Sequence, residues 1–465
     1  MADKRIHMFS KETYVARRAK LKQAVGSGLL LFLGNDESGM NYADNAYHFR
    51  QDSTFLYFFG LPYAGLSAIM DIDNDKEIIF GDELTIDAIV WMGIQPTLKE
   101  KSEACGIQEV RPFKEIETYL KNAQQKGQEI HYLPTYRAEH QIKLFQWLGV
   151  VPGAERPSLP FIMGVVNQRI YKSEEEIVEI EKACQVTADM HLAAMRTVRP
   201  GIRESDVAAV VAEVALAHNY ELAFPTIATI NGQTLHNHDH SHPIKSGDML
   251  LLDAGAETEM GYAGDMSSTI PADPKFTTRQ KEIFDIQVAA HETAVAALRP
   301  GVPFVDVYEL SCKVIMEGLK DLGFVKGDPM EAVKAGAHAM FMPCGLGHMM
   351  GLDVHDMENL GETYVGYNGK PKSTQFGRKS LRLGRELEPG FVLTIEPGVY
   401  FIPELMDLWK SQGKFTEFIN YDKLFTYKDF SGIRNEEDYL ITADGARLLG
   451  KKTPLHAEDI EALHC

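Results

Sequence analysis

The sequence predicts an α/β N-terminal domain over residues 1–170, followed by an α+β domain over residues 171–465 that is duplicated about a pseudo-twofold axis. Three observations predict this fold class. A helix-start signal follows residue 172, a nine-residue motif occurs twice after that point, and two apolar strands each end in a carboxylate. The 465 residues are enough for two or three domains of ordinary size.

The composition is that of a folded, acidic protein. It contains 47 Lys and Arg against 66 Asp and Glu, a net charge of −19, with 45% hydrophobic and 24% charged residues. An acidic surface repels a phosphate backbone, and the densest basic stretch, residues 378–385, is short and followed by glutamates. We therefore expect no nucleic-acid partner, and we interpret the basic stretch as a solvated loop or helix start.

The N-terminal domain is predicted to combine helices with short apolar strands. A charged amphipathic helix is expected around residues 11–25, and strands are expected at Gly28–Leu33 and Ala68–Asp71. The first residues are polar where a secretory signal needs an apolar core, and the longest apolar runs are far too short to span a membrane. We therefore expect no contact with a membrane.

The cysteines indicate a reducing compartment. They are scattered, odd in number and never arranged as Cys-x-x-Cys, which argues against a disulfide framework and against a zinc–thiolate site. They are Cys105, Cys184, Cys312, Cys344 and Cys465. We expect the protein to be cytoplasmic.

The second domain is predicted to begin with a helix and to contain an internal repeat. After a break at Asn167–Lys172, Ser173 is a candidate N-cap followed by glutamates in the first turn. The motif RPGIRESDV at residues 199–207 recurs as RPGVPFVDV at residues 299–307, both between helical segments. Two copies indicate a duplicated lobe rather than a solenoid, and chance recurrence of a Pro-Gly turn between helices is the alternative.

Strands that end in a carboxylate point to a metal site. Each copy has an apolar strand with a carboxylate six residues after a glycine, Asp253 in one and Glu396 in the other. A buried carboxylate is costly unless it is paired or binds a cation. Asp265 follows a Gly-rich turn, His348 lies among glycines, and Glu436 starts another apolar strand. Four carboxylates and one histidine favour two divalent metal ions bridged by carboxylates, with Mn²⁺ as the first choice and Co²⁺ or Zn²⁺ as alternatives.

The order and local context of these residues resemble the metallopeptidases of the pita-bread fold, which include methionine aminopeptidase, prolidase and Xaa-Pro aminopeptidase. The resemblance extends from about residue 173 to the end. It is carried by HMMGLDVHD from His348, TIEPGVY from Thr394 and GIRNEED from Gly432. The stretch at residues 47–60, YHFRQDSTFLYFFG, resembles the N-terminal domain of aminopeptidase P, although it also fits an aromatic-rich strand in a domain core.

The resemblance implies a ligand set and a nucleophile. The metal ligands would be Asp253, Asp265, His348, Glu396 and Glu436. Among them Asp265 and Glu436 would bridge the ions, a water activated by the ions would be the nucleophile, and Glu396 would also pass a proton to the leaving nitrogen.

The same resemblance implies three further catalytic residues. His355 would donate a hydrogen bond to the tetrahedral oxyanion, His236 would lie on the opposite wall near the scissile bond, and Arg434 would orient a peptide carbonyl or carboxylate. The neighbouring histidines of the HNHDHSH run are instead interpreted as part of a solvated turn before a proline; they are His238, His240 and His242.

Two positions depart from the family pattern. Asp265 lies twelve positions after Asp253, a spacing one longer than is usual, which implies an extra residue in the turn at Glu257–Met260. Cys344 stands where proline-specific relatives usually have histidine, which affects how substrate is positioned beyond the proline, although a cysteine there also fits a small buried residue.

The expected function is hydrolysis of the bond between an N-terminal residue and a following proline in peptides. Prolidase, which is restricted to dipeptides, is the alternative enzyme, and a non-catalytic pita-bread binding module is the alternative outside enzymes. Creatinase-like chemistry shares the layout but is metal-free and does not require the ligand set. We expect peptide substrates with proline at the second position and a homodimer or homotetramer.

Overall fold

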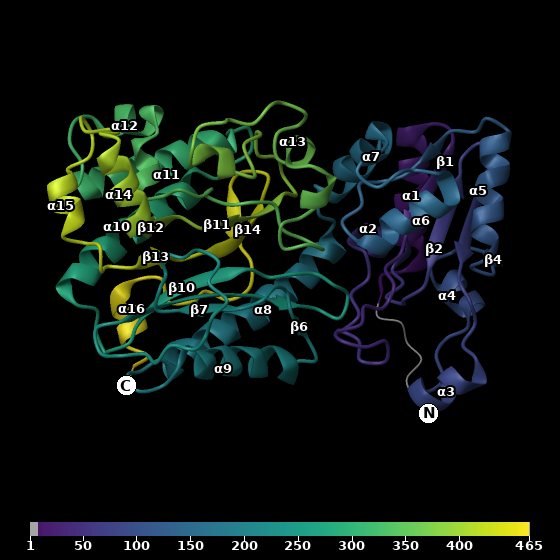
Figure 1. Ribbon diagram of the computed structural model, residues 1–465, viewed down its shortest axis with the longest axis horizontal. Coiled ribbons are helices and arrows are strands. Elements are labelled where there is room, and N and C mark those ends of the chain that lie inside the picture. The colour runs from purple at the N-terminus through teal and green to yellow at the C-terminus, as the bar shows by residue number, and fades with distance from the viewer. Residues whose placement is uncertain (1–7, 465) are drawn as a thin grey trace. The chain divides into compact units, whose positions relative to one another are not determined.

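The computed structural model describes residues 8–464, which divide into two compact units (Figure 1). Unit 1 extends to Arg169 and also includes Met357–Gly361, and unit 2 comprises Ile170–Asp356 and the chain from Glu362 onward. The last helix of unit 1 continues to Arg169. The irregular segment expected at Asn167–Lys172 is therefore shorter than the sequence indicates. Cys465 lies outside the described residues.

Unit 1 is built on a five-stranded mixed sheet of order β4-β3-β2-β1-β5. The β1–β5 and β3–β4 pairs are parallel, and the other pairs are antiparallel. Its strands are β1 (Leu29–Leu33), β2 (Ser67–Asp71), β3 (Lys76–Phe80), β4 (Glu109–Arg111) and β5 (Ile130–His131). Its helices are α1 (Lys11–Val25), α2 (Ser53–Phe59), α3 (Ile86–Met92), α4 (Leu98–Ala104), α5 (Glu115–Gln125), α6 (Ala138–Leu148) and α7 (Leu159–Arg169). The predicted helix and both predicted strands are confirmed.

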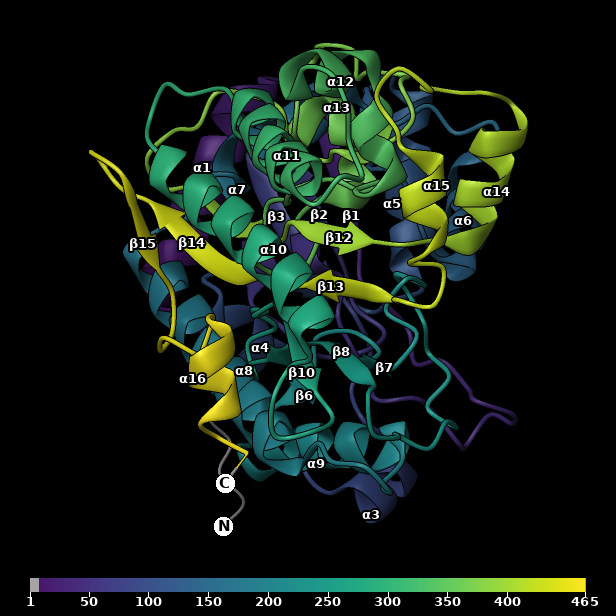
Figure 2. The same cartoon turned by 90° about the vertical axis from the view of Figure 1, so that its left-hand side faces the viewer.

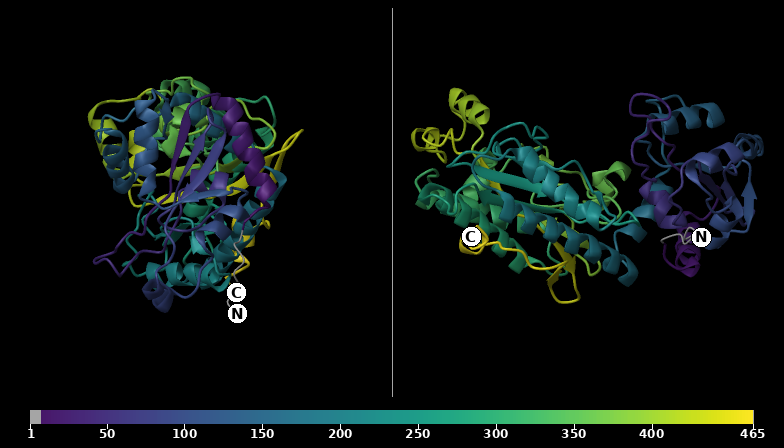
Figure 3. Two further views of the ribbon diagram at one scale, coloured as in Figure 1. Left: turned by 90° about the vertical axis from the view of Figure 1, so that its right-hand side faces the viewer. Right: turned by 90° about the horizontal axis from the view of Figure 1, so that it is seen from below.

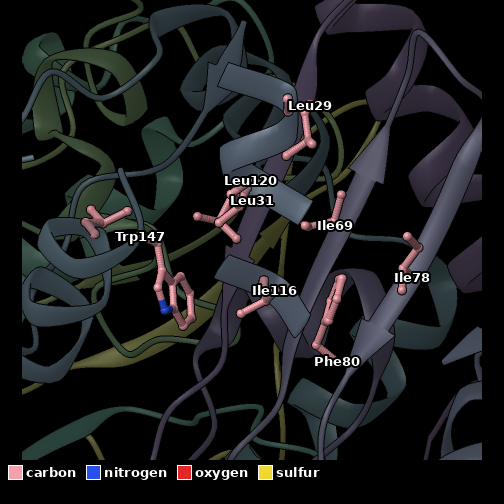
Figure 4. Close-up of a cluster of buried hydrophobic side chains, with 10 residues drawn as sticks. Leu29, Leu31, Ile69, Ile78, Phe80, Ile116, Leu120 and Trp147 are labelled. Atoms are coloured by element: carbon pink, nitrogen blue, oxygen red, sulfur yellow. The ribbon is translucent and has the colours of Figure 1, made fainter. Parts of the chain in front are cut away.

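Alternating apolar side chains give the sheet of unit 1 a core on each face. On one face, Leu29, Leu31 and their neighbours pack against α5 and α6 (Figure 4). On the other face, Phe32 makes ring contacts with Phe58 and Phe59 of α2 and with Phe161 of α7. Helix α1 packs beside α2 and α7. In the left view of Figure 3, α1 is the purple helix beside the strands of unit 1. This layering gives unit 1 the α/β class that the sequence predicts.

The interpretation of residues 47–60 as a strand is wrong, because the aromatic part of the segment forms helix α2. Asp52 caps the helix by accepting a hydrogen bond from the Phe55 backbone N–H, and Gly60 ends it in the left-handed conformation with φ of 64°. Every residue of α2 is buried. A run of consecutive aromatic residues lacks both the period of two and the period of 3.6, so the capping residues decide the structure.

Unit 2 contains two small sheets of three strands, β10-β8-β7 and β11-β14-β15, with helices around them. Its strands are β6 (Glu221–Leu222), β7 (Ile227–Thr229), β8 (Met249–Ala254), β9 (Ala256–Glu257), β10 (Met266–Pro271), β11 (Val392–Ile395), β12 (Gly398–Tyr400), β13 (Gly432–Arg434), β14 (Glu437–Ile441) and β15 (Ala446–Leu448). Its helices are α8 (Glu174–Thr197), α9 (Glu204–Ala217), α10 (Thr278–Ala297), α11 (Phe304–Asp321), α12 (Pro329–Ala335), α13 (Glu362–Val365), α14 (Pro403–Ser411), α15 (Tyr421–Phe425) and α16 (Ala457–Glu461).

The predicted start of α8 is confirmed. The Ser173 side chain accepts a hydrogen bond from the Glu176 backbone N–H at 3.3 Å, and the Glu176 carboxylate accepts one from the Ser173 backbone N–H at 3.0 Å. This reciprocal capping box explains why the sequence alone locates the helix start.

The duplication of unit 2 is confirmed by matching backbone contacts. Helices α8 and α9 form one pair, and α10 and α11 form another (Figure 2). Between the helices of each pair, a glycine with positive φ donates a hydrogen bond from its N–H, Gly201 to Ile244 O at 2.9 Å and Gly301 to Leu387 O at 2.8 Å. We call residues 174–271 the first lobe and residues 278–441 the second lobe.

The cysteines and the helices bear on the expected compartment and on membrane contact. The four cysteines within the described residues are free, and three of them are buried; the four are Cys105, Cys184, Cys312 and Cys344. Among residues 8–464, no helix combines the length and the apolar character needed to cross a membrane.

Candidate metal centre

The first lobe places two of the predicted ligands on one hairpin. Asp253 lies in β8, and Asp265 directly precedes β10, which pairs with β8 in antiparallel register. The turn at Glu257–Met260, where the sequence predicts an extra residue, lies at the hairpin tip, where Glu257 bridges to Ala263 and the Thr258 N–H donates to Tyr262 O at 2.9 Å. The two carboxylates therefore lie on neighbouring strands as the sequence indicates.

The second lobe supplies the other three predicted ligands. Glu396 follows β11, and its N–H donates to Leu346 O at 2.8 Å. His348 lies beside the same strand. Its carbonyl oxygen accepts a hydrogen bond from the Thr394 N–H at 3.0 Å, and its N–H donates one to the Thr394 hydroxyl at 3.2 Å. Glu436 occupies the junction of β13 and β14.

The two lobes meet at the junction that carries Glu436. The Glu436 N–H donates to Ser267 O at 3.0 Å, and the Ser267 hydroxyl donates to the Glu436 carboxylate at 2.7 Å. The neighbouring Thr269 exchanges hydrogen bonds with the backbone of Arg434 at 2.9 and 3.0 Å. Strand β10 of the first lobe is thus fixed against the ligand-bearing segment of the second lobe.

The ligand atoms converge on one buried point. One atom each from Asp265, His348 and Glu436 lies within 4.8 Å of the other two. The His348 Nδ1 atom lies 3.0 Å from Met349 O, which leaves Nε2 facing Asp265 Oδ2 at 3.4 Å and Glu396 Oε1 at 3.6 Å. A histidine whose other ring nitrogen is held by a carbonyl is oriented as a metal ligand.

The centre has the charge and the unpartnered oxygens that a divalent cation satisfies. Three buried oxygens, Asp253 Oδ1, Asp265 Oδ1 and Glu436 Oε1, have no hydrogen-bond partner among the described residues. Burial raises the pKa of Asp265 and of Glu436 well above the usual range, and neighbouring carboxylates raise both further. Burial also raises the pKa of Glu396. The residues present therefore fit bound divalent metal.

The guanidinium group of Arg434 donates hydrogen bonds to three side chains near the ligand atoms. Its Nη2 donates to Asp253 Oδ2 at 2.6 Å, its Nη1 to the Tyr400 hydroxyl at 2.8 Å, and its Nε to the Ser267 hydroxyl at 2.9 Å. The side chain of Arg434 is 96% buried. It supplies a fixed positive charge on the side of Asp253 that faces away from Oδ1.

The other predicted histidines differ in their surroundings. The His355 ring packs against the His348 ring in a T-shaped arrangement with centroids 4.3 Å apart. His236 is exposed, yet partial burial lowers its pKa and the positive charge of Arg434 lowers it further. His236 is therefore neutral near pH 7.

The remaining histidines of the HNHDHSH run make structural contacts. His240 Nε2 lies 3.0 Å from Thr226 O, and His242 Nδ1 lies 3.0 Å from the buried Glu204 carboxylate. His238 is exposed. Residues 237–242 form an irregular segment in which His238 is exposed and His240 and His242 are half-buried, so the expectation of a solvated turn is only partly met. The buried partner of His242 is a contact that the sequence does not reveal.

Cys344 is half-buried and packs against a small apolar cluster that includes Ile227, Leu251 and Tyr400. Burial raises the pKa of its thiol to about 12, and the nearby Glu396 carboxylate acts in the same direction. The thiol is therefore protonated at neutral pH and is not a nucleophile.

Comparisons with known proteins agree with this geometry. Residues 178–443 match the model of metallopeptidase family M24, and residues 14–131 match the model of the aminopeptidase P N-terminal domain. The fold and the centre define a metallopeptidase. The chain belongs to metallopeptidase family M24, and the N-terminal match adds the aminopeptidase P type of first domain. The pita-bread fold and the division into an α/β and an α+β part are thereby confirmed.

Full-length relatives and solved structures are similar to this chain. The Xaa-Pro aminopeptidase of Escherichia coli (strain K12) is 31% identical over 474 residues, covering 98% of both chains. The Xaa-Pro dipeptidase of Homo sapiens is 28% identical, covering 96% of this chain and 91% of its own. A variant of Escherichia coli aminopeptidase P in complex with substrate has a TM-score of 0.81 at 28% identity, covering 98% of both chains. Proline aminopeptidase P II from Yersinia pestis also scores 0.81 at 28% identity, covering 98% of this chain and 99% of its own.

Proposed function

We propose that this chain is a metal-dependent Xaa-Pro aminopeptidase that hydrolyses the bond between an N-terminal residue and a following proline in peptides. The observation that carries the proposal is the convergence of carboxylates from both lobes, with unpartnered oxygens, around Nε2 of His348. Full-length similarity to the Escherichia coli Xaa-Pro aminopeptidase supports the substrate class.

The proposed ligand set is Asp253, Asp265, His348, Glu396 and Glu436, with Asp265 and Glu436 shared between two ions. Hard carboxylate oxygens with a single imidazole favour Mn²⁺, with Co²⁺ or Zn²⁺ as alternatives. When bound, such ions acidify water so that hydroxide forms near neutral pH, and they polarise the scissile carbonyl.

The chain's own residues would hold the substrate and move the protons. Glu396, whose pKa is raised by burial, is suited to accept a proton and return it to the proline nitrogen as that nitrogen leaves. The neutral imidazole of His236 and the ring of His355, which packs against His348, are suited to donate hydrogen bonds to the oxygen of the tetrahedral intermediate. Arg434 would act mainly by holding Asp253 in place, since its donors already bind that carboxylate, Tyr400 and Ser267.

A dipeptidase is the second candidate, because Xaa-Pro dipeptidases are also full-length relatives of this chain. The two activities differ in whether the cleft accepts residues beyond proline. A matched pair of substrates, an Xaa-Pro dipeptide and an Xaa-Pro-Yaa peptide, separates them when both are offered to chelator-stripped protein with and without Mn²⁺.

Metal-dependent cleavage of the longer peptide at its first bond is the expected result. Cleavage of the dipeptide alone would make the protein a prolidase. No cleavage of either substrate with Mn²⁺, Co²⁺ or Zn²⁺ would contradict the enzymatic proposal and favour a binding module.

The finer assignments belong to the same proposal. The domain boundaries are proposed as residues 1–170 and 171–465. The buried free thiols support a reducing compartment, which we propose is the cytoplasm. The assembly is proposed to be a homodimer or homotetramer, and the net charge of −19 argues against nucleic acid as a partner.

A further inference from the structure

Helix α8 directs three polar side chains at the hairpin that carries Asp253 and Asp265. Cys184, Thr187 and His191 are spaced by three and four residues, which places them on one face of the helix. All three side chains are almost completely buried. A helix face that is buried against a sheet normally carries apolar residues, so polar groups in all three places require partners.

Cys184 reaches Asp265 through a buried carboxylate. The thiol donates to Asp438 Oδ2 at 3.1 Å, and the same oxygen accepts the backbone N–H of Asp265 at 3.0 Å. Burial raises the pKa of Cys184 well above its usual value, so the thiol keeps the proton that it donates. The thiol therefore holds the carboxylate that fixes the backbone of Asp265.

Thr187 fixes the hairpin at Ala256, three residues after Asp253. Its Oγ1 accepts the Ala256 N–H at 2.9 Å. Gly264, directly before Asp265, approaches so closely that a Cβ there would lie 2.7 Å from Thr187 Oγ1 and 2.9 Å from the Cys184 nitrogen. The hairpin backbone rests directly on the helix at this point.

His191 binds both strands of the hairpin. Its Nε2 lies 3.1 Å from Ala254 O, directly after Asp253, and its Nδ1 lies 2.9 Å from the Ser268 hydroxyl. The carbonyl can only accept, so Nε2 carries the proton and Nδ1 accepts from the serine. The ring thus spans β8 and β10 next to both carboxylates.

We propose that the polar face of α8, formed by Cys184, Thr187 and His191, is a positioning element for the metal centre, acting on Asp265 through Asp438 and on Asp253 through Ala254 O. Thr187 and His191 directly, and Cys184 through Asp438, reach backbone atoms within three residues of a proposed ligand, so the face sets where the carboxylates point without touching metal or substrate. Groups that orient metal ligands in this way commonly change metal affinity by about 10–100-fold when they are removed. The inference rests on the proposed ligand set.

The test compares Mn²⁺ affinity with the stability of the metal-free protein. The full chain and its variants Cys184→Ala, Cys184→Ser and Thr187→Val are stripped with chelator, and the Mn²⁺ dissociation constant is measured by competition with a chelating dye. Thermal unfolding of each metal-free protein is recorded in parallel. Cys312→Ala is the matched control, because Cys312 is also a completely buried thiol of unit 2 but its sulfur contacts Met342 at 4.0 Å rather than a carboxylate.

We expect Cys184→Ala and Thr187→Val each to raise the dissociation constant about tenfold or more. Cys184→Ser, which keeps a donor for Asp438, should recover most of the affinity, and Cys312→Ala should leave it unchanged. A different result would overturn the inference: Cys184→Ala and Thr187→Val lower the melting temperature as Cys312→Ala does, but bind Mn²⁺ as tightly as the wild type. The polar face of α8 would then contribute only to the stability of the fold. A wild-type chain that binds no Mn²⁺, Co²⁺ or Zn²⁺ would instead overturn the proposed ligand set.

Discussion

The two lobes of unit 2 share a backbone plan but differ in the side chains that their first helices direct inward. Positions in α8 and α10 correspond at an offset of 100 residues, the same offset as the repeated RPG turns. Thr187 and His191 in α8 therefore correspond to Gln287 and His291 in α10. Gln287 donates to Pro397 O at 2.7 Å, directly after Glu396, as His191 binds Ala254 O directly after Asp253.

The equivalent histidines have different environments. Both rings are buried, but His191 has partners for both nitrogens, whereas neither nitrogen of His291 has a hydrogen-bond partner among the described residues. The Glu437 carboxylate lies 3.7 Å from His291 Nε2, beyond hydrogen-bond distance. Phe284 replaces the carboxylate-binding Cys184.

This difference shows what the duplication retains and what it changes. The glycine turn, the helix pair and the strand that ends in a carboxylate are common to both lobes. The hydrogen bonds that fix each carboxylate come from different residue types. We conclude that the two lobes hold one centre through a shared backbone and through separate networks of side chains.

The largest expected effect comes from removing one ligand from either lobe. Asp265→Asn and Glu396→Gln should each lower kcat/KM by about a thousandfold or more, since each loses several kcal/mol of transition-state stabilisation. Steady-state kinetics with saturating Mn²⁺ measure this, and circular dichroism checks that the fold is intact. A full rate in either variant would mean that its lobe does not contribute to the centre.

The second prediction concerns the pH dependence of stability. Burial lowers the pKa of His191 and of His291 to about 4, although the nearby Ile395 backbone partly opposes the shift in His291. The unfolded chain, with an ordinary histidine pKa of about 6.5, binds more protons between these values. The free energy of unfolding therefore falls as the pH drops from about 6.5 to 4, by about 3 kcal/mol for each histidine.

Other buried groups also titrate in this pH range, so the loss of unfolding free energy between pH 7 and pH 4 is compared between each variant and the wild type. Urea unfolding of metal-free protein at pH 7 and pH 4 should show that His191→Leu and His291→Leu each lose about 3 kcal/mol less than the wild type over this interval. An equal loss in the variants would show that the two rings titrate normally in the folded protein.

At pH 7 the same two variants should differ in how much unfolding free energy they lose, because the two histidines differ in their hydrogen bonds. His191→Leu removes the two buried imidazole contacts, to Ala254 O and to the Ser268 hydroxyl, and the loss of two such hydrogen bonds costs about 1–3 kcal/mol. Leucine at position 291 removes two ring nitrogens that have no hydrogen bond, so we expect a change within about 1 kcal/mol. Equal losses in urea unfolding would contradict the difference between the two histidine environments.

The smallest expected effect concerns the contact that links the lobes through Arg434. Tyr400→Phe removes the hydroxyl that accepts a hydrogen bond from Arg434, while the bond of Arg434 to Asp253 remains. A hydrogen bond to a charged group contributes about 1.5–3 kcal/mol, and part of that should appear as a roughly tenfold lower kcat. Kinetics at saturating metal measure the change, and an unchanged kcat would remove Tyr400 from the network around the centre.

Sequence motifs predicted the features that depend on neighbouring residues. The capping box of α8 is a local pattern, and the predicted ligands lie in short motifs at strand ends that the fold brings together. The repeat at residues 199–207 and 299–307 likewise predicted the duplication, because each copy is a turn of fixed geometry.

Contacts between distant residues could not be predicted in the same way. The bond from Arg434 to Asp253 spans 181 residues, and that from Cys184 to Asp438 spans 254. A cysteine on an apolar helix face is typical of core packing, so no local pattern connects Cys184 with the metal centre. Helix α2 differs from the expected strand because its aromatic run has no period, and its structure depends instead on the caps Asp52 and Gly60.

Counting bound ions tests most directly whether both lobes build one centre. Chelator-stripped full chain, Asp265→Asn and Glu436→Gln are titrated with Mn²⁺ by isothermal titration calorimetry. We predict two ions per chain for the wild type, and fewer or much weaker sites when the proposed bridging carboxylate of either lobe is replaced. No binding by the wild type, or two ions bound with wild-type affinity in either variant, would contradict a shared metal centre.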